Sequence, residues 1–579
     1  MNPYIKMKPT YLAALCLLLL ATFGCNRNGG DGKNGDGSGG LFGSKSDEVK
    51  TDSLFIKKYI SNKQAFKEQE ELVYLFYGDR DYTLGWFKDD KLVPQTERFL
   101  EVINRATKEG LDPKEYKVVN FEEMFKRYDA MSKRDTARHQ LQQEIDVALT
   151  ASYFNYASDF YTGRINPSDT KQVNWNVRKN KIKLHKALQT ILKERESTYP
   201  YYEFEALHDG YVKLREALQT YRALQEKGGW PKVELGASKS LKKGDTAEAV
   251  LTIRKRLNPG QQLDPANPSL RLFDDNLDKQ VKQFQRLHGL AEDGVVGGNT
   301  LKTMNVSIED RIDQIMINME RWRWIPKRMV PKKLDQKYVW VNIPEYKLYI
   351  YEDPDNDPEA ERQYKKVEEM RVIVGKTMHS TPIFSEKMEY VVMAPYWNVP
   401  NSIVANEIKP AIMRDPNYLN RNNMEIVTKD KANNPISQDA IDWASVTEEN
   451  FPYLIRQKPG PKNSLGSIKF LFPNEYSVYL HDTPADALFS QTDRNFSHGC
   501  VRVERPVDLG TYVLKDMPEW NAGKIQETIN GGEETWVTLP KPIQVYLVYF
   551  TSWVDDNGNL NFREDIYGHD KKLENEFFS

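Results

Sequence analysis

The sequence predicts a multidomain α+β protein with a helical domain, a three-helix module and a mainly-β domain that carries a long insertion. Three observations support this fold class. The 579 residues suit roughly three or four domains, apolar residues recur at helical spacing in the first half, and alternating, strand-like segments fill residues 337–553. Hydrophobic residues are 39% of the chain and charged residues 28%, so these regions can bury cores.

The first 24 residues have the pattern of an export signal. Two lysines precede an apolar run over residues 11–20, which is too short to span a membrane comfortably, and Gly24 and Cys25 follow. This segment resembles a bacterial lipoprotein signal, which implies that Cys25 is lipidated and becomes the new first residue. An uncleaved signal anchor and ordinary cleavage near Ala21 are the alternatives. We expect residues 25–50, a Gly-rich tract, to form a flexible tether.

The chain has three cysteines, and one of them stands alone in the folded part. Cys16 lies in the expected signal and Cys25 at the expected lipid site, which leaves Cys500. A single thiol in an oxidising compartment is at risk of oxidation, so its presence there favours a chemical role over a packing role. The 81 basic and 83 acidic residues nearly cancel, and this balance argues against a nucleic-acid partner.

Residues 51–235 are expected to form the helical domain. Side chains at helical spacing give one of its helices an apolar face; they are Leu141, Ile145, Leu149, Ser152, Tyr156 and Phe160. Gly163 and Pro167 predict where this helix ends. The sequence shows no group of residues here that points to chemistry, so a structural role is the preferred interpretation.

Residues 236–306 predict a compact module of three helices. Val250, Ile253 and Leu257 belong to the first helix, residues 281–288 to the second, and the third begins near Asn299. A string of motif residues joins the last two: Phe284, Gln285, Gly289, Leu290, Asp293, Gly294, Gly297 and Thr300. The module resembles the peptidoglycan-binding domain family. Glycines that only shape a tight turn would explain part of the string.

A connecting helix over residues 307–336 and a strand-rich domain over residues 337–553 follow. Seven segments of this domain alternate in the manner of strands: residues 338–343, 346–351, 371–374, 389–393, 467–472, 476–481 and 543–550. The first two predict a hairpin around Pro344 and Glu345. Residues 395–465, which contain eight prolines, interrupt the domain as an insertion of the kind that forms a lid or binding loop. Residues 554–579 are expected to be a tail.

Two histidines lie within 20 residues of the lone thiol. His481 closes a predicted strand, and His498 and Gly499 directly precede Cys500. An imidazole next to a thiol can take its proton and so produce a nucleophile. Gly499 leaves room for a substrate, and backbone N–H groups of such a turn can stabilise an oxyanion. Zinc ligation by His481, His498 and Cys500 is one alternative, and a packing role is another.

The strand-rich domain resembles the YkuD-type L,D-transpeptidase catalytic domain, whose signature is an upstream histidine followed by Ser-His-Gly-Cys, here His481 and residues 497–500. Further segments fit the large scaffold-bearing, YcbB-type subgroup: residues 318–324, 341–344, 395–400, 456–457 and 469–474. Arg502 stands where asparagine is usual in the wider family, and the subgroup often has arginine there. The resemblance spans most of residues 51–553.

The resemblance implies a reaction on peptidoglycan stem tetrapeptides. Cys500 attacks the carbonyl between the third residue, a diamino acid, and the terminal D-Ala, which leaves. The side-chain amine of a second stem then resolves the acyl-enzyme and forms a cross-link between two third residues. Resolution by water would instead make the protein an L,D-carboxypeptidase. A peptidoglycan-binding adaptor with an inactive catalytic domain is the alternative from another class. The resemblance implies no cofactor and no metal, peptidoglycan peptides and glycan as partners, and a periplasmic location at the membrane.

The resemblance also assigns roles within the site. His481 is the base, with its ring oriented by the backbone carbonyl of Asp482, while His498 lies beside the site. The N–H groups of Gly499 and Cys500 are the oxyanion donors. The insertion is expected to cap the donor peptide and exclude water. The residues assigned to substrate binding are Tyr396, Trp397, Asn398, Tyr479, Asp482, Ser497 and Arg502. Trp397 as core and Arg502 in a structural ion pair are the alternatives.

Overall fold

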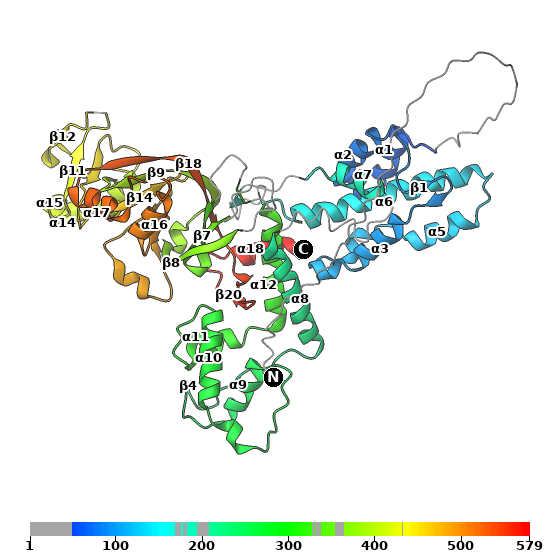
Figure 1. The fold of residues 1–579 in the computed structure, drawn as a ribbon, viewed down its shortest axis with the longest axis horizontal. Coiled ribbons are helices and arrows are strands. Elements are labelled where there is room, and N and C mark those ends of the chain that lie inside the picture. Colours follow the sequence, from blue (N-terminus) through cyan, green and yellow to red (C-terminus); the bar gives the residue numbers. More distant parts are fainter. Residues whose placement is uncertain are drawn as a thin grey trace, which may run out of the picture.

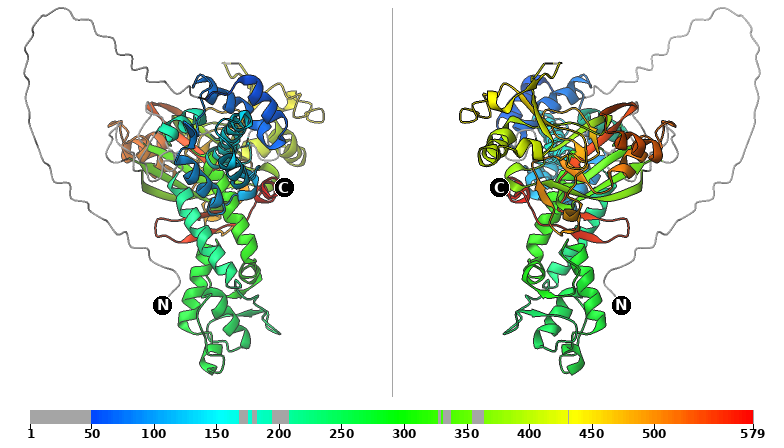
Figure 2. Two further views of the ribbon diagram at one scale, coloured as in Figure 1. Left: turned by 90° about the vertical axis from the view of Figure 1, so that its right-hand side faces the viewer. Right: turned by 90° about the vertical axis from the view of Figure 1, so that its left-hand side faces the viewer.

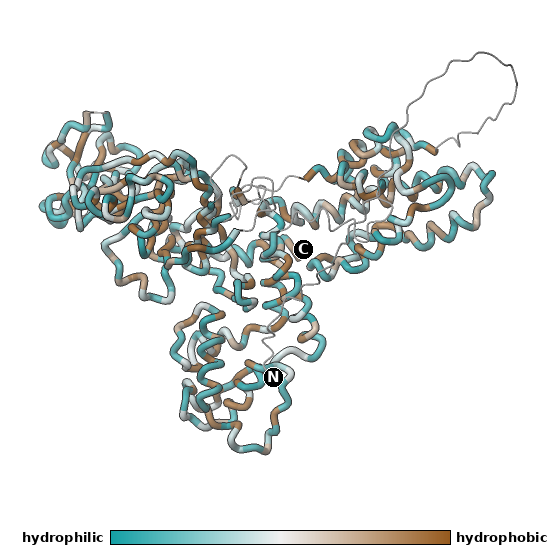
Figure 3. The backbone as a smooth tube through the Cα atoms, in the orientation of Figure 1, coloured by the Kyte–Doolittle hydropathy of each residue, from teal (hydrophilic) through white to brown (hydrophobic). Residues whose placement is uncertain are grey.

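A computed structural model describes residues 49–167, 175–177, 182–193, 208–326, 329–330, 337–353, 364–430 and 432–578. The expected signal, Cys25 and almost the whole tether lie outside these residues. In Figure 1 three lobes meet at a central pair of helices, with the helical domain at one end, the sheet-bearing domain at the other and the three-helix module below. No helix within the described ranges is long and apolar enough to cross a membrane, and Figure 3 shows hydrophilic and hydrophobic stretches alternating along the lobes.

The helical domain is a bundle built around one central helix. Its elements are α1 (Ser53–Ser61), η1 (Gln64–Gln69), α2 (Glu70–Gly78), the hairpin of β1 (Phe87–Lys88) and β2 (Lys91–Leu92), α3 (Gln95–Asn104), η2 (Ala106–Glu109), α4 (Pro113–Tyr116), α5 (Phe121–Ala130), α6 (Thr136–Thr162), α7 (Leu184–Lys193) and α8 (Asp209–Glu226). Asp135 caps the start of α6, and the helix ends at Gly163, as the sequence predicts.

Helix α6 differs from its prediction in one respect, because it is buried around most of its circumference rather than along one face. Other helices of the bundle surround it, so its middle turns have no solvent side. Asp146 on α6 is fully buried and accepts hydrogen bonds from the N–H groups of Gly85 and Trp86 and the hydroxyl of Tyr77. Burial raises the pKa of this carboxyl. These bonds fix the β1–β2 region onto the central helix.

The three-helix module has the predicted helices and a small core of its own. Its elements are β4 (Ser240–Leu241), α9 (Glu248–Leu257), η3 (Pro268–Arg271), α10 (Asp275–Leu287), β5 (Val296–Gly297) and α11 (Gly298–Met304). The buried side chain of Gln285 donates to Asp293 Oδ1 at 2.7 Å and to Thr300 Oγ1 at 3.1 Å, and accepts from the Gly294 N–H. The motif residues therefore hold the turn between α10 and α11 together.

Helix α12 (Ile308–Trp324) joins the three lobes. It packs along α8, and Figure 2 shows this pair rising side by side from the module. Arg323 is fully buried, pairs with Glu320 and donates to the hydroxyl of Tyr211 on α8. Arg321, also fully buried, pairs with Asp570 at 2.6 Å. Because both arginines are desolvated, these pairs fix the geometry in which the lobes meet.

The sheet of the third lobe closes on itself. Its strands are β6 (Lys337–Asn342), β7 (Lys347–Glu352), β8 (Lys365–Gly375), β9 (Ile383–Met393), β14 (Ile468–Leu471), β15 (Leu480–His481), β17 (Val501–Val503) and β18 (Thr535–Val548). They follow the order β14-β15-β17-β8-β7-β6-β18-β9, and β9 pairs again with β14. The predicted hairpin of β6 and β7 is present.

Smaller elements complete this lobe. The strand β16 (Asn495–Ser497) pairs with β8, and β3 (Trp175–Asn176), which lies between α6 and α7 in the chain, pairs in parallel with the Ile383 end of β9. The remaining elements are η4 (Ile343–Glu345), η5 (Thr377–His379), η8 (Asp486–Ser490), α16 (Pro506–Val513) and α17 (Ala522–Gly531).

The insertion forms a subdomain with a separate core. Its elements are β10 (Trp397–Asn398), α13 (Asn401–Ile403), the π-helix η6 (Val404–Ile408), α14 (Lys409–Arg414), α15 (Tyr418–Arg421), β11 (Met424–Val427), β12 (Pro435–Ile436), η7 (Gln438–Ala440) and β13 (Leu454–Gln457). The strands form a four-stranded sheet in the order β10-β13-β11-β12. In Figure 1 this subdomain lies at the outer end of the lobe.

Residues 554–578 are folded rather than a tail, which corrects the expectation from sequence. The hairpin of β19 (Ser552–Val554) and β20 (Leu560–Phe562) precedes α18 (His569–Phe577), which packs on α12. Leu573 and Phe577 are buried in the main core, and Asp570 is the partner of Arg321. The sequence hides this because the segment is rich in charged and polar residues and has few apolar ones.

Candidate active site

The parallel pairing of β15 with β17 brings the predicted nucleophile and base to neighbouring strands. Leu480 pairs with Val501, and His481 with Arg502, while the Val501 N–H donates to the carbonyl of Tyr479 at 3.1 Å. Cys500 thus lies beside Tyr479, two positions along the ladder from the pair of His481 and Arg502. The two predicted partners, 19 positions apart in the chain, share one region of the sheet.

The thiol of Cys500 is partly exposed, and it contacts the segment that leads into β15. Sγ lies 3.8 Å from the carbonyl oxygen of Ser477. Burial raises the pKa of Cys500, while hydrogen bonds from Tyr479 and the charge of Arg502 oppose this rise. The pKa of Tyr479 is raised by burial and by the neighbouring thiol. The side chain of Cys500 is therefore a neutral thiol at rest. Its thiolate would have hydrogen-bond donors nearby.

The imidazole of His481 is buried and held by the backbone. Its Nδ1 lies 2.5 Å from the carbonyl oxygen of Asp482, the orienting contact that was expected. Burial, followed by the charge of Arg502, lowers the pKa of His481 to about 3. The ring is neutral and can accept a proton. In the described part of the chain no hydrogen bond joins it to the thiol, and such bonds often tighten only when a substrate binds.

Residues 497–500, here called the nucleophile loop, are held by the hydroxyl of Ser497. This hydroxyl donates to the carbonyl of Cys500 at 2.6 Å and accepts from the Gly499 N–H at 3.1 Å. The Gly499 N–H, expected as an oxyanion donor, is therefore hydrogen-bonded to Ser497 in this structure. The Cys500 N–H stays the candidate oxyanion donor. Gly499 has φ +118°, a conformation that other residues rarely adopt.

A second set of bonds supports the nucleophile loop from below. Thr381 donates to the carbonyl of Gly499 at 2.8 Å and accepts from the Gly375 N–H at 2.9 Å. The hydroxyl of Tyr567, from the folded C-terminal segment, donates to the carbonyl of Gly375 at 2.6 Å and accepts from the Thr381 N–H at 3.3 Å. Sequence reasoning missed Thr381 and Tyr567, because both are distant in the chain and belong to no motif.

His498 connects the nucleophile loop to the insertion. Its Nε2 lies 2.7 Å from Oε1 of Glu407, which belongs to the π-helix η6, and its ring is 5.4 Å from that of His379. The π-helices of proteins are frequent at functional sites. Sequence reasoning placed His498 beside the site but gave no hint of Glu407, 91 positions earlier. This contact places the insertion directly beside the nucleophile.

The other expected binding residues lie around this centre in different ways. Tyr396 packs its ring on Arg456 and donates its N–H to Glu534, at the base of the insertion. Trp397 packs on the core of the insertion and Asn398 is exposed, and both belong to β10. The structural alternative for Trp397 is thus favoured.

The carboxylate of Asp482 accepts hydrogen bonds from the N–H and hydroxyl of Ser467 and the N–H of Thr483. This carboxylate holds the loop. The part of Asp482 that contacts His481 is its backbone carbonyl. Arg502, by contrast, has a buried Nε without a hydrogen-bond partner, so the ion-pair alternative has no support among the described residues. Its guanidinium stays a candidate for a substrate carboxylate.

The described residues give no support for the alternative of a zinc site. Among the described residues, no three His, Cys, Asp or Glu side chains gather closely enough to hold a metal ion.

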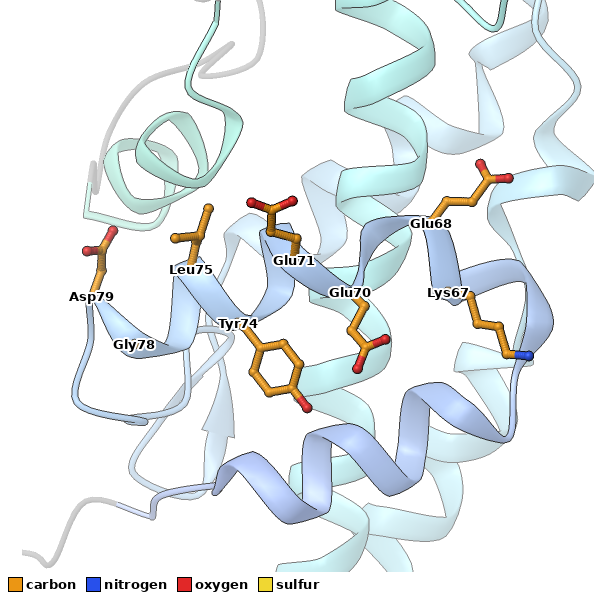
Figure 4. Close-up of a pocket in the computed structure, with 8 residues that line it drawn as sticks. All are labelled: Lys67, Glu68, Glu70, Glu71, Tyr74, Leu75, Gly78 and Asp79. Atoms are coloured by element: carbon orange, nitrogen blue, oxygen red, sulfur yellow. The ribbon is translucent and has the colours of Figure 1, made fainter.

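A shallow hollow of about 640 Å³ lies in the helical domain, lined by η1 and α2 (Figure 4). In Figure 4 Glu68 and Glu71 point away from α1, while Tyr74 points toward it and donates to the carbonyl of Ser53.

Three regions of the chain match known domain families. Residues 71–218 match the scaffold domain, residues 246–304 match the family described as "Putative peptidoglycan binding domain", and residues 336–527 match the L,D-transpeptidase catalytic domain. The last match contains His481 and the whole nucleophile loop. The three regions coincide with the helical, three-helix and sheet-bearing lobes, and so confirm the predicted fold class.

A curated relative and solved structures are also similar to parts of the chain. A protein of Haemophilus influenzae described as "Putative L,D-transpeptidase" is 34% identical over 268 residues, which are 46% of this chain and 50% of that protein. The L,D-transpeptidase structure from Stackebrandtia nassauensis is 12% identical and covers 54% of this chain and 96% of its own, with a TM-score of 0.17. A fused Zn-dependent amidase/peptidase/peptidoglycan-binding protein from Clostridium acetobutylicum is 12% identical and covers 54% and 99%, with a TM-score of 0.15.

Proposed function

The chain has the domain composition of a scaffold-bearing L,D-transpeptidase, and from this premise we propose that it cross-links peptidoglycan stem peptides in the cell envelope through a thioester on Cys500. The observation that carries the proposal is the placement of a partly exposed thiol and a buried, backbone-held imidazole on adjacent parallel strands. A thiol with a base nearby is the arrangement that nucleophilic acyl transfer uses.

The first half-reaction forms the acyl-enzyme. His481 takes the proton of the Cys500 thiol as sulfur attacks the carbonyl before the terminal D-Ala, and the Cys500 N–H donates to the oxygen that becomes negative. The C–N bond then breaks, and the D-Ala amine leaves with the proton that His481 held. In the second half-reaction an amine of another stem attacks the thioester and releases the thiol. Water in place of the amine gives trimming instead of a cross-link.

The direct test uses disaccharide-tetrapeptides and mass spectrometry of the products. We expect release of D-Ala and a dimer joined through two third residues. Release of D-Ala without any dimer would favour the carboxypeptidase alternative. A folded protein that releases no D-Ala and gives no adduct with a carbapenem would favour the inactive adaptor.

His481 and His498 should differ strongly when each is replaced by alanine. General-base catalysis contributes about 10²–10⁴-fold, so His481→Ala should slow D-Ala release by that factor. His498→Ala should slow it far less, because its ring is bonded to Glu407. The rate of carbapenem adduct formation provides a second measurement of the same step. A fast His481→Ala enzyme with a slow His498→Ala enzyme would reverse the assignment.

The pH dependence of the first half-reaction should be a broad plateau. Because the pKa of His481 is about 3 and burial raises that of Cys500, both groups stay neutral from about pH 5 to 8. Proton transfer from thiol to imidazole within a neutral pair does not depend on pH in this window. We therefore expect kcat/KM for D-Ala release to stay constant there. An acidic limb with a midpoint near 6.5 that disappears in His481→Ala would contradict the neutral pair.

A further inference from the structure

The face of the sheet that carries His481 is positively charged. Lys469 on β14 is directly opposite His481, and Arg502 on β17 is paired with it on the other side. Directly paired residues of neighbouring strands project to the same face, so the three side chains form a row. Both cations lower the pKa of His481. Lys469 is only 11% exposed, and Glu534 lies 3.8 Å from its Nζ.

At His498 the nucleophile loop contacts a negatively charged side chain. Glu407 of the insertion contacts His498, two residues before Cys500. Its side chain is 53% exposed although it is paired, so one carboxylate oxygen still faces solvent beside the site. The groups that face this pair include the ring of His379. The site is therefore asymmetric, with Lys469 and Arg502 around His481 and a carboxylate beside His498.

The two half-reactions of the proposed function have opposite electrostatic requirements. The donor ends in a carboxylate, which suits the cations. The acceptor is a primary amine, and such an amine is a cation at neutral pH because its pKa is near 10.4. Lys469 and Arg502 repel an ammonium group, whereas a carboxylate attracts one and holds it by a charge-assisted hydrogen bond. A cationic acceptor would thus approach from the insertion rather than from the His481 side.

We propose that Glu407, oriented by His498, binds the ammonium group of the acceptor stem and so directs it to the thioester. This inference rests on the proposed function and names the part of the site that selects the second substrate. The ammonium loses one proton to the His498–Glu407 pair, which releases it to water. The free amine attacks the carbonyl, the C–N bond forms as the C–S bond breaks, and the second amine proton ends on the Cys500 sulfur.

The test compares Glu407→Gln with the full-length parent protein, since glutamine keeps a hydrogen bond to His498 and removes the charge. Binding of an amine-bearing tripeptide stem is measured by calorimetry in a Cys500→Ala background, where no reaction interferes. We expect Glu407→Gln to weaken this binding about tenfold, the loss typical of one charge-assisted bond. Glu448→Gln, which removes an exposed charge elsewhere on the insertion, is the control and should bind as the parent does.

Kinetics of the active enzyme separate acceptor recognition from a purely structural role. D-Ala release should stay within about twofold in Glu407→Gln, while the KM for the tripeptide acceptor rises about tenfold. Transfer to hydroxylamine, which is uncharged at neutral pH, should be unchanged. Unchanged acceptor binding, or an equal loss with hydroxylamine and the amine, would overturn the inference. A parent that releases no D-Ala but binds the tripeptide through Glu407 would overturn the proposed function and leave only the ammonium-binding role of Glu407.

Discussion

Replacement of Cys500 by alanine should abolish both D-Ala release and cross-link formation, with a loss of about 10⁴-fold or more, as expected when a covalent nucleophile is removed. No other thiol exists in the described part of the chain. The thiol is partly exposed and its contact with the carbonyl of Ser477 is long, at 3.8 Å, so the fold should tolerate the change.

Two measurements together check the role of Cys500. Product analysis gives the loss of rate, and intact-mass spectrometry after exposure to a carbapenem shows whether the adduct forms. We expect the adduct on the parent and none on Cys500→Ala. The matched control is Ser477→Ala, which keeps the backbone carbonyl that contacts Sγ and should retain the adduct. Residual cross-linking by Cys500→Ala would mean that another group does the chemistry.

Replacement of Asp570 by alanine should destabilise the protein by about 3–5 kcal/mol, the typical cost of breaking a buried ion pair from one side. Arg321 is fully buried and would be left with its charge unpaired, while the hydroxyl of Thr551 would lose its acceptor. The effect should appear as a lower urea midpoint for the transition of the sheet-bearing lobe.

Lys571→Ala is the matched control for Asp570→Ala. It lies next in the same helix, its side chain is 76% exposed, and its pair with Glu574 is on the surface. Exposed pairs contribute little, so this variant should unfold within about 1 kcal/mol of the parent. Equal stability of the two variants would contradict the view that α18 is an integral part of the core.

Local patterns in the sequence predicted much of this structure. Periodicity located α6, the three helices of the module and the β6–β7 hairpin, because each depends on neighbours within a few turns. Cys500 and His481 were also expected to lie close together, and the pairing of β15 with β17 places them so, while their roles as nucleophile and base stay predictions. The cysteine count alone indicated Cys500, because the other two cysteines lie in the expected signal and at the expected lipid site.

Those local patterns could not predict contacts between distant segments of the chain. Nothing near Glu407 indicates that it contacts His498, and nothing near Tyr567 indicates that it supports Gly375 beneath the nucleophile loop. The burial of α6 on all sides depends on how many helices surround it, which periodicity does not report. The closure of the sheet by β9 and β14 likewise depends on a pairing across 75 positions of chain, from Met393 to Ile468.

The short strand β3 has a consequence for how the molecules behave in a crowded envelope. The Val391–Met393 end of β9 is paired with β14 as well as β18, but the Ile383–Phe384 end reaches beyond β14 and is paired there with Trp175 and Asn176. An unpaired strand edge invites sheet-to-sheet association between molecules. Two residues that lie between α6 and α7 of the helical domain therefore shield an edge of the main sheet at which two copies of this protein could otherwise add to each other and aggregate.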